Sequence, residues 1–405
     1  MVAAAVDLRM LGDIVGAHNV RDARAGDEVR GIAPAAVVSP ATDAEVSAVL
    51  AAATARNLAV VARGGGTKIG WGAPPVRCDL VLSTSRIEGI VDHEPADLVC
   101  VARAGTTLAD LQSRLASTEG FRQRLMLDPP QGAAATLGGV VATAASGSLR
   151  TRFGTPRDLV IGAAFVLADG TTGRSGGKVV KNVAGFDIAK LLTGSLGTLA
   201  VMTELAFRLH PLPAASTTVV FESRSVEELC AFATAVGRLQ VTPSVVDLHW
   251  PEGTVVVRFD SSARGAAVQA EHVVQAAGGR VLPPRDAESM AAALAGTPWH
   301  GSGDVAAIAV LPSRSAALLT ALSGGTCESL VLRPLLGTGE VRCAPEAAGD
   351  VATAVRRSGG RLVMRRGDGV DVGDDDDVAV DLMRSVKRQL DPAGTLSPGR
   401  QLGGI

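Results

Sequence analysis

The sequence predicts an α+β protein made of two units and a C-terminal helix. Its 405 residues are enough for two or three domains. Apolar strands alternate with amphipathic helices up to about residue 212, where prolines at 211 and 213 end the pattern, and the alternation resumes at residue 216. We therefore expect an N-terminal segment at 1–32, a first domain at 33–212, a smaller α+β domain at 213–370, and a C-terminal helix and tail at 371–405.

The first domain has the clearest pattern. Thr42 is a suitable N-cap for a helix over 43–57, in which apolar residues recur at helical spacing. Asp169-Gly170 predicts a hairpin turn after a buried strand. In chain order we expect strands at 58–62, 80–83, 98–103, 159–167 and 199–209, and further helices at 106–117, 136–145 and 186–192.

The second domain repeats the alternation of strands and helices without a recognisable sequence repeat. Its acidic run at 374–377 is expected to be a solvated loop. We expect strands at 217–221, 254–259, 304–311 and 328–332, helices at 225–239, 263–278 and 313–323, and a final helix at 378–390.

Composition excludes several classes of function. Thirty-nine Lys and Arg against 41 Asp and Glu give a net charge of −2, which argues against a dedicated binder of nucleic acid or of an anionic membrane. The five cysteines form no C-x-x-C pair, so we expect no metal or iron–sulfur site within this chain and a reducing, cytoplasmic location. We expect neither a signal peptide nor a membrane span.

Three glycine-rich turns stand at the ends of predicted strands or at the start of a helix. The first follows a strand at 63–68, and its successive backbone N–H groups would converge on one anion. The second opens the helix at 136–145, where the helix dipole favours an anion. The third lies at 194–203. Each turn alone is equally consistent with a plain loop or with tight packing. Three within one domain favour a phosphate-bearing ligand, and Gly65→Asp is expected to abolish its retention.

These residues also carry a family resemblance. RGGGT at 63–67, PP at 129–130 with TLGG at 136–139, SG at 146–147, GTPRDLVIG at 154–162, LADG at 167–170 and GSLGTL at 194–199 resemble the vanillyl-alcohol oxidase / p-cresol methylhydroxylase (PCMH-type) FAD-binding superfamily. Within it, GKVVKNVAGFD at 177–187 and LDPAGTLSPGR at 390–400 resemble the FAD-binding subunit of bacterial glycolate oxidase (GlcE type). The resemblance covers 33–212 and about the last twenty residues.

The resemblance implies a two-lobed FAD-binding domain, a cap domain at 213–370, and a C-terminal tail that returns to the FAD-binding domain. It implies that the diphosphate is surrounded by Arg63, Gly64, Gly65, Gly66, Thr67 and Lys68. It places Pro130, Thr136, Leu137, Gly138 and Gly139 along the diphosphate and the ring, Thr143, Ser146 and Gly147 near the isoalloxazine, and backbone bonds to adenine at Val201. Ala200 and Phe186 depart from the family's frequent Gly and Tyr. Thr67 and Lys68 stand where relatives attach flavin through His, so we expect non-covalent FAD.

The resemblance further implies FAD-dependent oxidation of a 2-hydroxy acid of the glycolate or D-lactate type. The C-terminal half lacks paired histidines, and His249 is its one candidate for a base in a plausible cap strand. We therefore expect a homologous FAD-binding catalytic subunit and an iron–sulfur subunit as partners, with at most peripheral membrane association through them. Two alternatives stay open: a self-sufficient FAD-dependent alcohol or hydroxy-acid oxidoreductase, and a flavin-free structural subunit of the same fold.

Overall fold

The computed structural model describes residues 6–178, 185–367 and 377–405, and it confirms the predicted α+β class. The chain divides into two compact units. Of the described residues, unit 1 contains 6–146, 155–178, 185–212 and 377–405, and unit 2 contains 147–154 and 213–367. Residues 6–32 cluster with unit 1, and 147–154 cluster with unit 2 although we expected them in the first domain. The expected boundary at 370–371 and most of the acidic run lie outside the described residues.

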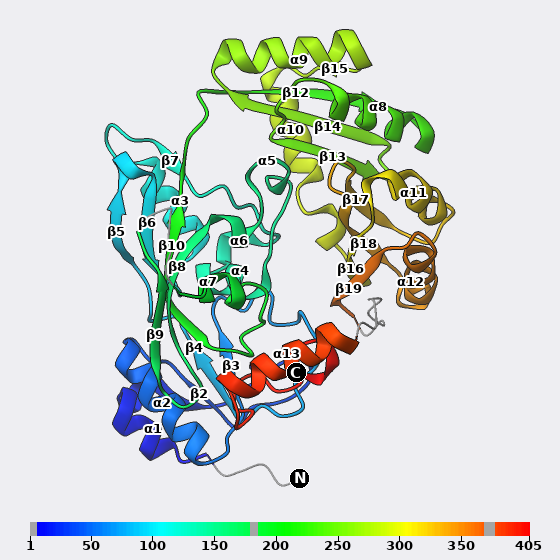
Figure 1. Ribbon diagram of the computed structural model, residues 1–405. Helices are drawn as coiled ribbons and strands as arrows, with labels where there is room; N and C mark the ends of the chain where they lie inside the picture. The colour runs from blue at the N-terminus through cyan, green and yellow to red at the C-terminus, as the bar shows by residue number, and fades with distance from the viewer. Residues whose placement is uncertain (1–5, 179–184, 368–376) are drawn as a thin grey trace. The chain divides into compact units, whose positions relative to one another are not determined.

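The first lobe of unit 1 is a four-stranded sheet covered by two helices (Figure 1). Strand β1 pairs with β2 antiparallel, whereas β2, β4 and β3 run parallel. Apolar side chains of both helices form one core with this sheet. The elements are α1 (Leu8–Val15), β1 (Val20–Asp22), β2 (Ala36–Val38), α2 (Asp43–Ala55), β3 (Val60–Arg63) and β4 (Leu80–Ser83). Because β3 and β4 are parallel, their carboxyl ends meet at one edge, and the first glycine-rich turn begins there.

The second lobe is an antiparallel five-stranded sheet in the order β5-β6-β10-β8-β9. The predicted hairpin joins β8 to β9, with Gly170 at a φ of 89° in its turn. The strands are β5 (Ile90–Glu94), β6 (Val99–Arg103), β8 (Val160–Val166), β9 (Thr172–Gly176) and β10 (Val201–Arg208). The helices are α3 (Leu108–Ala116), α4 (Leu137–Thr143), α6 (Pro156–Leu159) and α7 (Ile188–Leu192), and a small ribbon pairs β7 (Gln123–Arg124) with β11 (His210–Pro211).

The C-terminal segment belongs to unit 1. Helix α13 (Asp377–Leu390) leads into a tail that runs beside β3. The amide of Val60 donates to the Thr395 carbonyl over 2.7 Å, and the amide of Ser397 donates to the Val60 carbonyl over 2.8 Å. The last residues of the chain therefore lie against the strand that carries the first glycine-rich turn.

Unit 2 is built on an eight-stranded antiparallel sheet that consists of two similar halves. Each half has the order strand, helix, strand, strand, helix, strand, and the two halves join where β13 pairs with β17. The sequence showed no such repeat. The strands are β12 (Ala215–Glu222), β13 (Val245–Trp250), β14 (Thr254–Ser261), β15 (Arg280–Val281), β16 (Asp304–Ala309), β17 (Ser329–Arg333), β18 (Thr338–Cys343) and β19 (Arg361–Arg366).

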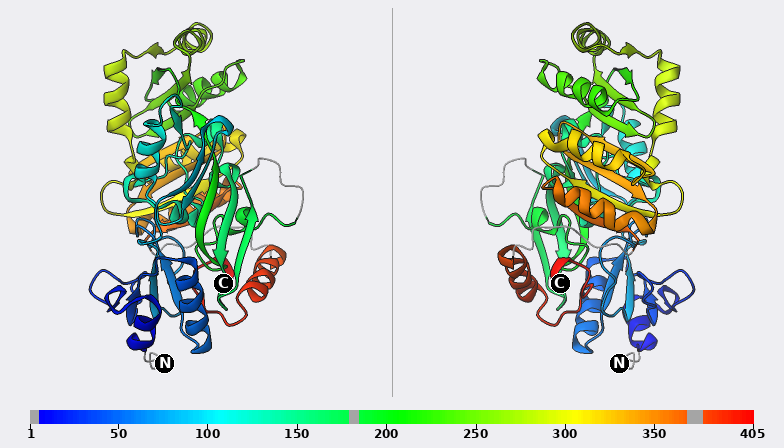
Figure 2. Two further views of the ribbon diagram at one scale, coloured as in Figure 1. Left: turned by 90° about the vertical axis from the view of Figure 1, so that its left-hand side faces the viewer. Right: turned by 90° about the vertical axis from the view of Figure 1, so that its right-hand side faces the viewer.

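Four helices of unit 2 pack with one face of this sheet to form its core (Figure 2). The opposite face carries polar side chains, including Asp247, Arg333 and Glu340. The helices are α5 (Arg150–Phe153), α8 (Val226–Arg238), α9 (Ala263–Ala277), α10 (Pro284–Leu294), α11 (Ser315–Ser323) and α12 (Ala348–Arg357), of which α8, α9, α11 and α12 form the core.

Candidate cofactor site

The glycine-rich turns of unit 1 meet around one hollow. It is bordered by the residues after β3, by α4, and by the turn that enters β10. Eleven of the fifteen candidate residues line it: Arg63, Gly64, Gly65, Gly66, Thr67, Lys68, Thr136, Gly138, Gly139, Thr143 and Val201. The structure thus brings together segments that are up to about 140 residues apart in the sequence.

Four candidate residues do not line the hollow. Leu137 is fully buried in the core, and Pro130 touches the site only through its carbonyl, which accepts from Lys68 Nζ over 2.8 Å. Ser146 is the last residue of its segment of unit 1, and Gly147 clusters with unit 2. The GKVVKNVAGFD segment falls largely on 179–184, outside the described residues.

The first turn offers a row of backbone donors. Within the described part of the chain, the amide N–H groups of residues 64–68 have no protein acceptor. Gly66 has a φ of 72°, the left-handed conformation that glycine adopts at little cost. Five successive N–H groups at the end of a parallel strand form a concave site that suits an anion.

The glycines of this turn are needed for a reason that the sequence did not show. A Cβ on Gly64 would lie 2.0 Å from Thr136 Oγ1, and one on Gly65 would lie 1.9 Å from the carbonyl oxygen of Ala134. These two glycines therefore allow the first turn to pack against the second. A side chain at Gly65 would strike protein backbone directly, so the expected effect of Gly65→Asp keeps its direction but has a different cause.

The first backbone donors of helix α4 are used within the protein. The amide of Leu137 donates to Thr106 O over 2.9 Å and that of Gly138 to Ala104 O over 2.8 Å. The amide of Gly139 donates to the N-cap hydroxyl of Thr136 over 3.3 Å. Because these donors are already used within the protein, the free backbone donors of this hollow come from the first turn, whereas Thr136, Gly138 and Gly139 line it at the start of α4.

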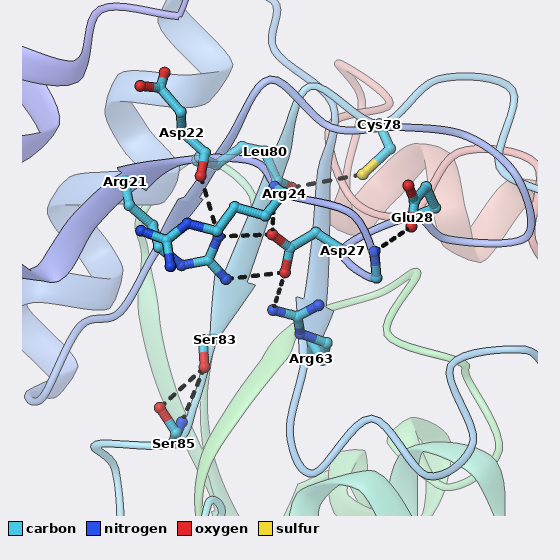
Figure 3. Close-up of polar contacts among 11 residues, drawn as sticks. Arg21, Asp22, Arg24, Asp27, Glu28, Arg63, Cys78, Leu80, Ser83 and Ser85 are labelled. Atoms are coloured by element: carbon cyan, nitrogen blue, oxygen red, sulfur yellow. Dashed lines mark hydrogen bonds and ion pairs between the residues drawn. The ribbon is translucent and has the colours of Figure 1, made fainter.

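Three cationic side chains line the hollow, and only one has a carboxylate partner among the described residues. Arg63 Nη2 pairs with Asp27 Oδ1 over 2.9 Å. Figure 3 shows Asp27 between Arg63 and Arg21, whose guanidinium donates to it over 2.6 and 2.9 Å. The hydrogen bonds from Arg21, with those from the Arg24 amide and Arg63, hold the pKa of the Asp27 carboxyl well below its usual range. Asp27 thus fixes Arg63, but it shares its single negative charge between Arg63 and Arg21.

Lys68 and Arg400 are buried, and they donate to neutral groups. Lys68 is 7% exposed, and its ammonium contacts Thr67 Oγ1 and the Pro130 carbonyl. Arg400 is 4% exposed, and its guanidinium donates to the carbonyls of Ile69, over 2.6 Å, and Trp71. Burial lowers the pKa of Lys68 to about 8 and that of Arg400 to about 10. Two desolvated cations that lack an anion are unfavourable unless a ligand supplies it.

Sequence reasoning missed Arg400 as a site residue. It lies more than 330 residues after the first turn, and the tail that carries it is fixed from several sides. Gln401 Nε2 donates to the Gly194 carbonyl over 2.6 Å, and buried Lys387 Nζ donates to the Thr198 carbonyl over 2.7 Å. In the sequence analysis, the LSPGR motif at 396–400 indicated the family resemblance but not that Arg400 lines the site. The hollow is also lined by residues that the sequence analysis did not select: Ala62, Ile69, Thr84, Ala104, Ala142, Leu196, Gly197, Ala200 and Met202.

The residues present fit a dinucleotide such as FAD. A diphosphate carries two negative charges and several acceptor oxygens, which match five free amides and two buried cations. Apolar residues such as Leu196 and Met202 line other parts of the hollow, which suits a flavin or adenine ring.

Unit 2 holds a separate buried polar cluster. Arg333 Nη1 pairs with Glu340 over 2.9 Å, and Arg333 Nε lies 3.8 Å from Asp247 Oδ1. Ser148 donates to the other oxygen of Asp247. Neighbouring His249 is 5% exposed, and burial lowers the pKa of its imidazole, which favours the neutral form. Its Nδ1 has no hydrogen-bond partner in the described structure.

Within the described residues, no cluster of three or more His, Cys, Asp or Glu side chains has the arrangement of a metal site. The helices that the structure describes include none long and apolar enough to cross a membrane.

Comparison with known proteins assigns the class. Residues 34–176 match the family model of the FAD binding domain. The chain is 40% identical over 176 residues to D-lactate dehydrogenase of Archaeoglobus fulgidus, covering 43% of this chain and 38% of that protein. It is 39% identical over 158 residues to glycolate oxidase subunit GlcE of Escherichia coli, covering 39% of this chain and 44% of that protein. The chain thus spans about two fifths of the length of these relatives.

Solved structures confirm the fold. p-Cresol methylhydroxylase superposes with a TM-score of 0.70 at 16% identity, covering 97% of this chain and 95% of that one. 4-Ethylphenol oxidase from Gulosibacter chungangensis gives 0.72 at 15% identity, with 97% and 96% coverage. The chain therefore has the fold of these proteins, and residues 34–176 contain an FAD binding domain, which supports FAD as the cofactor.

Proposed function

We propose that this chain is the FAD-binding subunit of a glycolate oxidase-like complex and takes part in oxidation of a 2-hydroxy acid of the glycolate or D-lactate type. The observation that carries the proposal is the hollow of unit 1, in which five free amides and the buried Lys68 and Arg400 provide a site for a diphosphate. The match to GlcE and to D-lactate dehydrogenase supports the substrate class. The FAD-binding domain speaks against the flavin-free alternative.

Bound FAD would accept the two electrons that leave the substrate carbon, and a base must remove the hydroxyl proton. Arg333, the buried cation at the centre of the unit 2 cluster, is already engaged by Asp247 and Glu340. A substrate carboxylate would have to displace them. This supports a division of labour in which a homologous FAD-binding subunit supplies the substrate site. We propose further that an iron–sulfur subunit receives the electrons.

A self-sufficient oxidoreductase is the second candidate, and one observation favours it. Neutral, buried His249 with an unpartnered Nδ1 has the protonation state that a base requires. The two candidates differ in whether the isolated chain is active. Dye reduction driven by glycolate or D-lactate should require the co-purified complex. Turnover by the single chain, abolished by His249→Ala, would replace the first proposal by the second.

We propose further that FAD is held non-covalently, since Thr67 and Lys68 occupy the first turn, and that the protein acts in the cytoplasm, which its five free cysteines support. Acid precipitation should release all the flavin into the supernatant. Flavin that remains on the polypeptide would contradict non-covalent binding.

A further inference from the structure

The described chain contains two buried lysines of unit 1 with opposite surroundings. Lys387 Nζ pairs with buried Asp391 over 2.6 Å and donates to two backbone carbonyls, so its charge is balanced within the protein. Lys68 Nζ has only the Pro130 carbonyl at 2.8 Å and the Thr67 hydroxyl at 3.2 Å. An ammonium has three N–H donors, and these acceptors use two of them.

The groups that face Lys68 add no negative charge. Arg63, which begins its own turn, shares the single charge of Asp27 with Arg21, and Arg400, from the tail, adds a further positive charge. The Trp71 ring lies 5.8 Å from Nζ, and the other lining residues, from α4 and from the turn that enters β10, are uncharged. Burial alone accounts for the low pKa of Lys68, about 8. Without an anion, this buried lysine therefore loses its proton at a lower pH than an exposed lysine does.

We propose that Lys68 is a proton-linked anchor of the FAD diphosphate: its side chain takes up a proton from solvent as the cofactor binds. The inference rests on the cofactor site proposed above. The diphosphate provides the Lys68 ammonium with the negatively charged partner that the described protein residues do not provide. Arg400 supplies a positive charge that is present over the whole working pH range. The affinity for FAD then falls with rising pH, although the diphosphate itself does not titrate there.

The test is calorimetric titration of the apoprotein with FAD in Tris and in HEPES, whose ionisation enthalpies differ. We expect uptake of about half a proton per FAD at pH 8 and almost none at pH 6. The dissociation constant should rise roughly tenfold or more between pH 7 and pH 9.5. ADP-ribose, which has the same diphosphate diester without the flavin, should show the same proton uptake.

Two variants of Lys68 distinguish the effect of its positive charge from the effect of its proton uptake. Lys68→Met should weaken FAD binding roughly 10- to 100-fold and abolish proton uptake. Lys68→Arg, which stays charged, should bind with little pH dependence, and circular dichroism shows whether either variant folds. Lys190→Met removes an exposed lysine that pairs with Asp187 and should behave like the parent protein.

Equal heats in both buffers for the parent at pH 8 would overturn the proton linkage. Uptake with FAD but not with ADP-ribose would overturn the assignment to the diphosphate. Uptake that persists in Lys68→Met would assign it to another group. Failure of the parent protein to bind FAD at any pH would instead refute the proposed cofactor site itself.

Discussion

Arg400→Met tests how much the C-terminal tail contributes to the cofactor site. Arg400 is buried, lines the hollow, and donates to the carbonyls of Ile69 and Trp71. Methionine keeps much of the apolar stem and removes the charge. The substitution is therefore expected to act on the ligand more than on the fold.

The magnitude follows from what the guanidinium does in each state. In the apoprotein, Met loses two hydrogen bonds to carbonyls but also removes a desolvated cation, so unfolding should become easier by at most about 2 kcal/mol. With a diphosphate present, a positive charge about 5 Å away contributes about 3 kcal/mol at an effective dielectric constant of ~20. We expect the dissociation constant for FAD to rise roughly 10- to 150-fold.

The assay is quenching of FAD fluorescence on titration with apoprotein, alongside thermal unfolding of the apoprotein. Arg388→Met is the matched control, because Arg388 is exposed on α13, where it donates to Ser385 Oγ over 3.0 Å, and it does not line the hollow. Affinity within twofold of the parent for Arg400→Met would show that Arg400 does not face the ligand. A large loss of apoprotein stability with unchanged affinity would make its role purely structural.

Three further predictions concern the frame of the site. Asp27→Asn should weaken FAD binding several-fold. Because the pKa of Asp27 is depressed in the folded protein, its contribution to the free energy of unfolding is full above about pH 4 and is lost as the pH falls below that. The stability of the variant should therefore change less between pH 5 and pH 2 than that of the parent protein. Gly65→Ala should lower the melting temperature and FAD retention, whereas Gly70→Ala, where a Cβ meets nothing within 4 Å, should change neither. Asp391→Asn should cost about 3–5 kcal/mol in chemical denaturation, because it leaves the Lys387 ammonium without its anion; a cost below about 1 kcal/mol would contradict this.

The local sequence pattern was sufficient to predict elements that depend on neighbouring residues. The strand predicted at 80–83 is β4, the helix predicted at 225–239 is α8 with small differences at its ends, and the Asp169-Gly170 turn joins β8 to β9. Sequence reasoning overlooked α1 and β18. Strand β18 lacks a continuous apolar run because its residues alternate between the core and the polar face of the sheet.

Most residues that line the site could be predicted from the sequence, but the contacts that hold them in place could not. Glycines at strand ends identified the first turn, yet their packing against Thr136 and Ala134 depends on where the second turn lies. The bonds that occupy the amides at the start of α4 come from Ala104 and Thr106, on a different segment. Arg400 reaches the hollow through pairing of the tail with β3, a contact across more than 330 residues that no local periodicity encodes.

The most direct test of the central claim is the flavin content of the protein purified after incubation with FAD and gel filtration. We expect a yellow protein with one FAD per chain, because the free amides and the two buried cations provide a site for a diphosphate. All of this FAD should be released on denaturation. A colourless protein that is correctly folded, by circular dichroism, and takes up no FAD would contradict the assignment of this hollow.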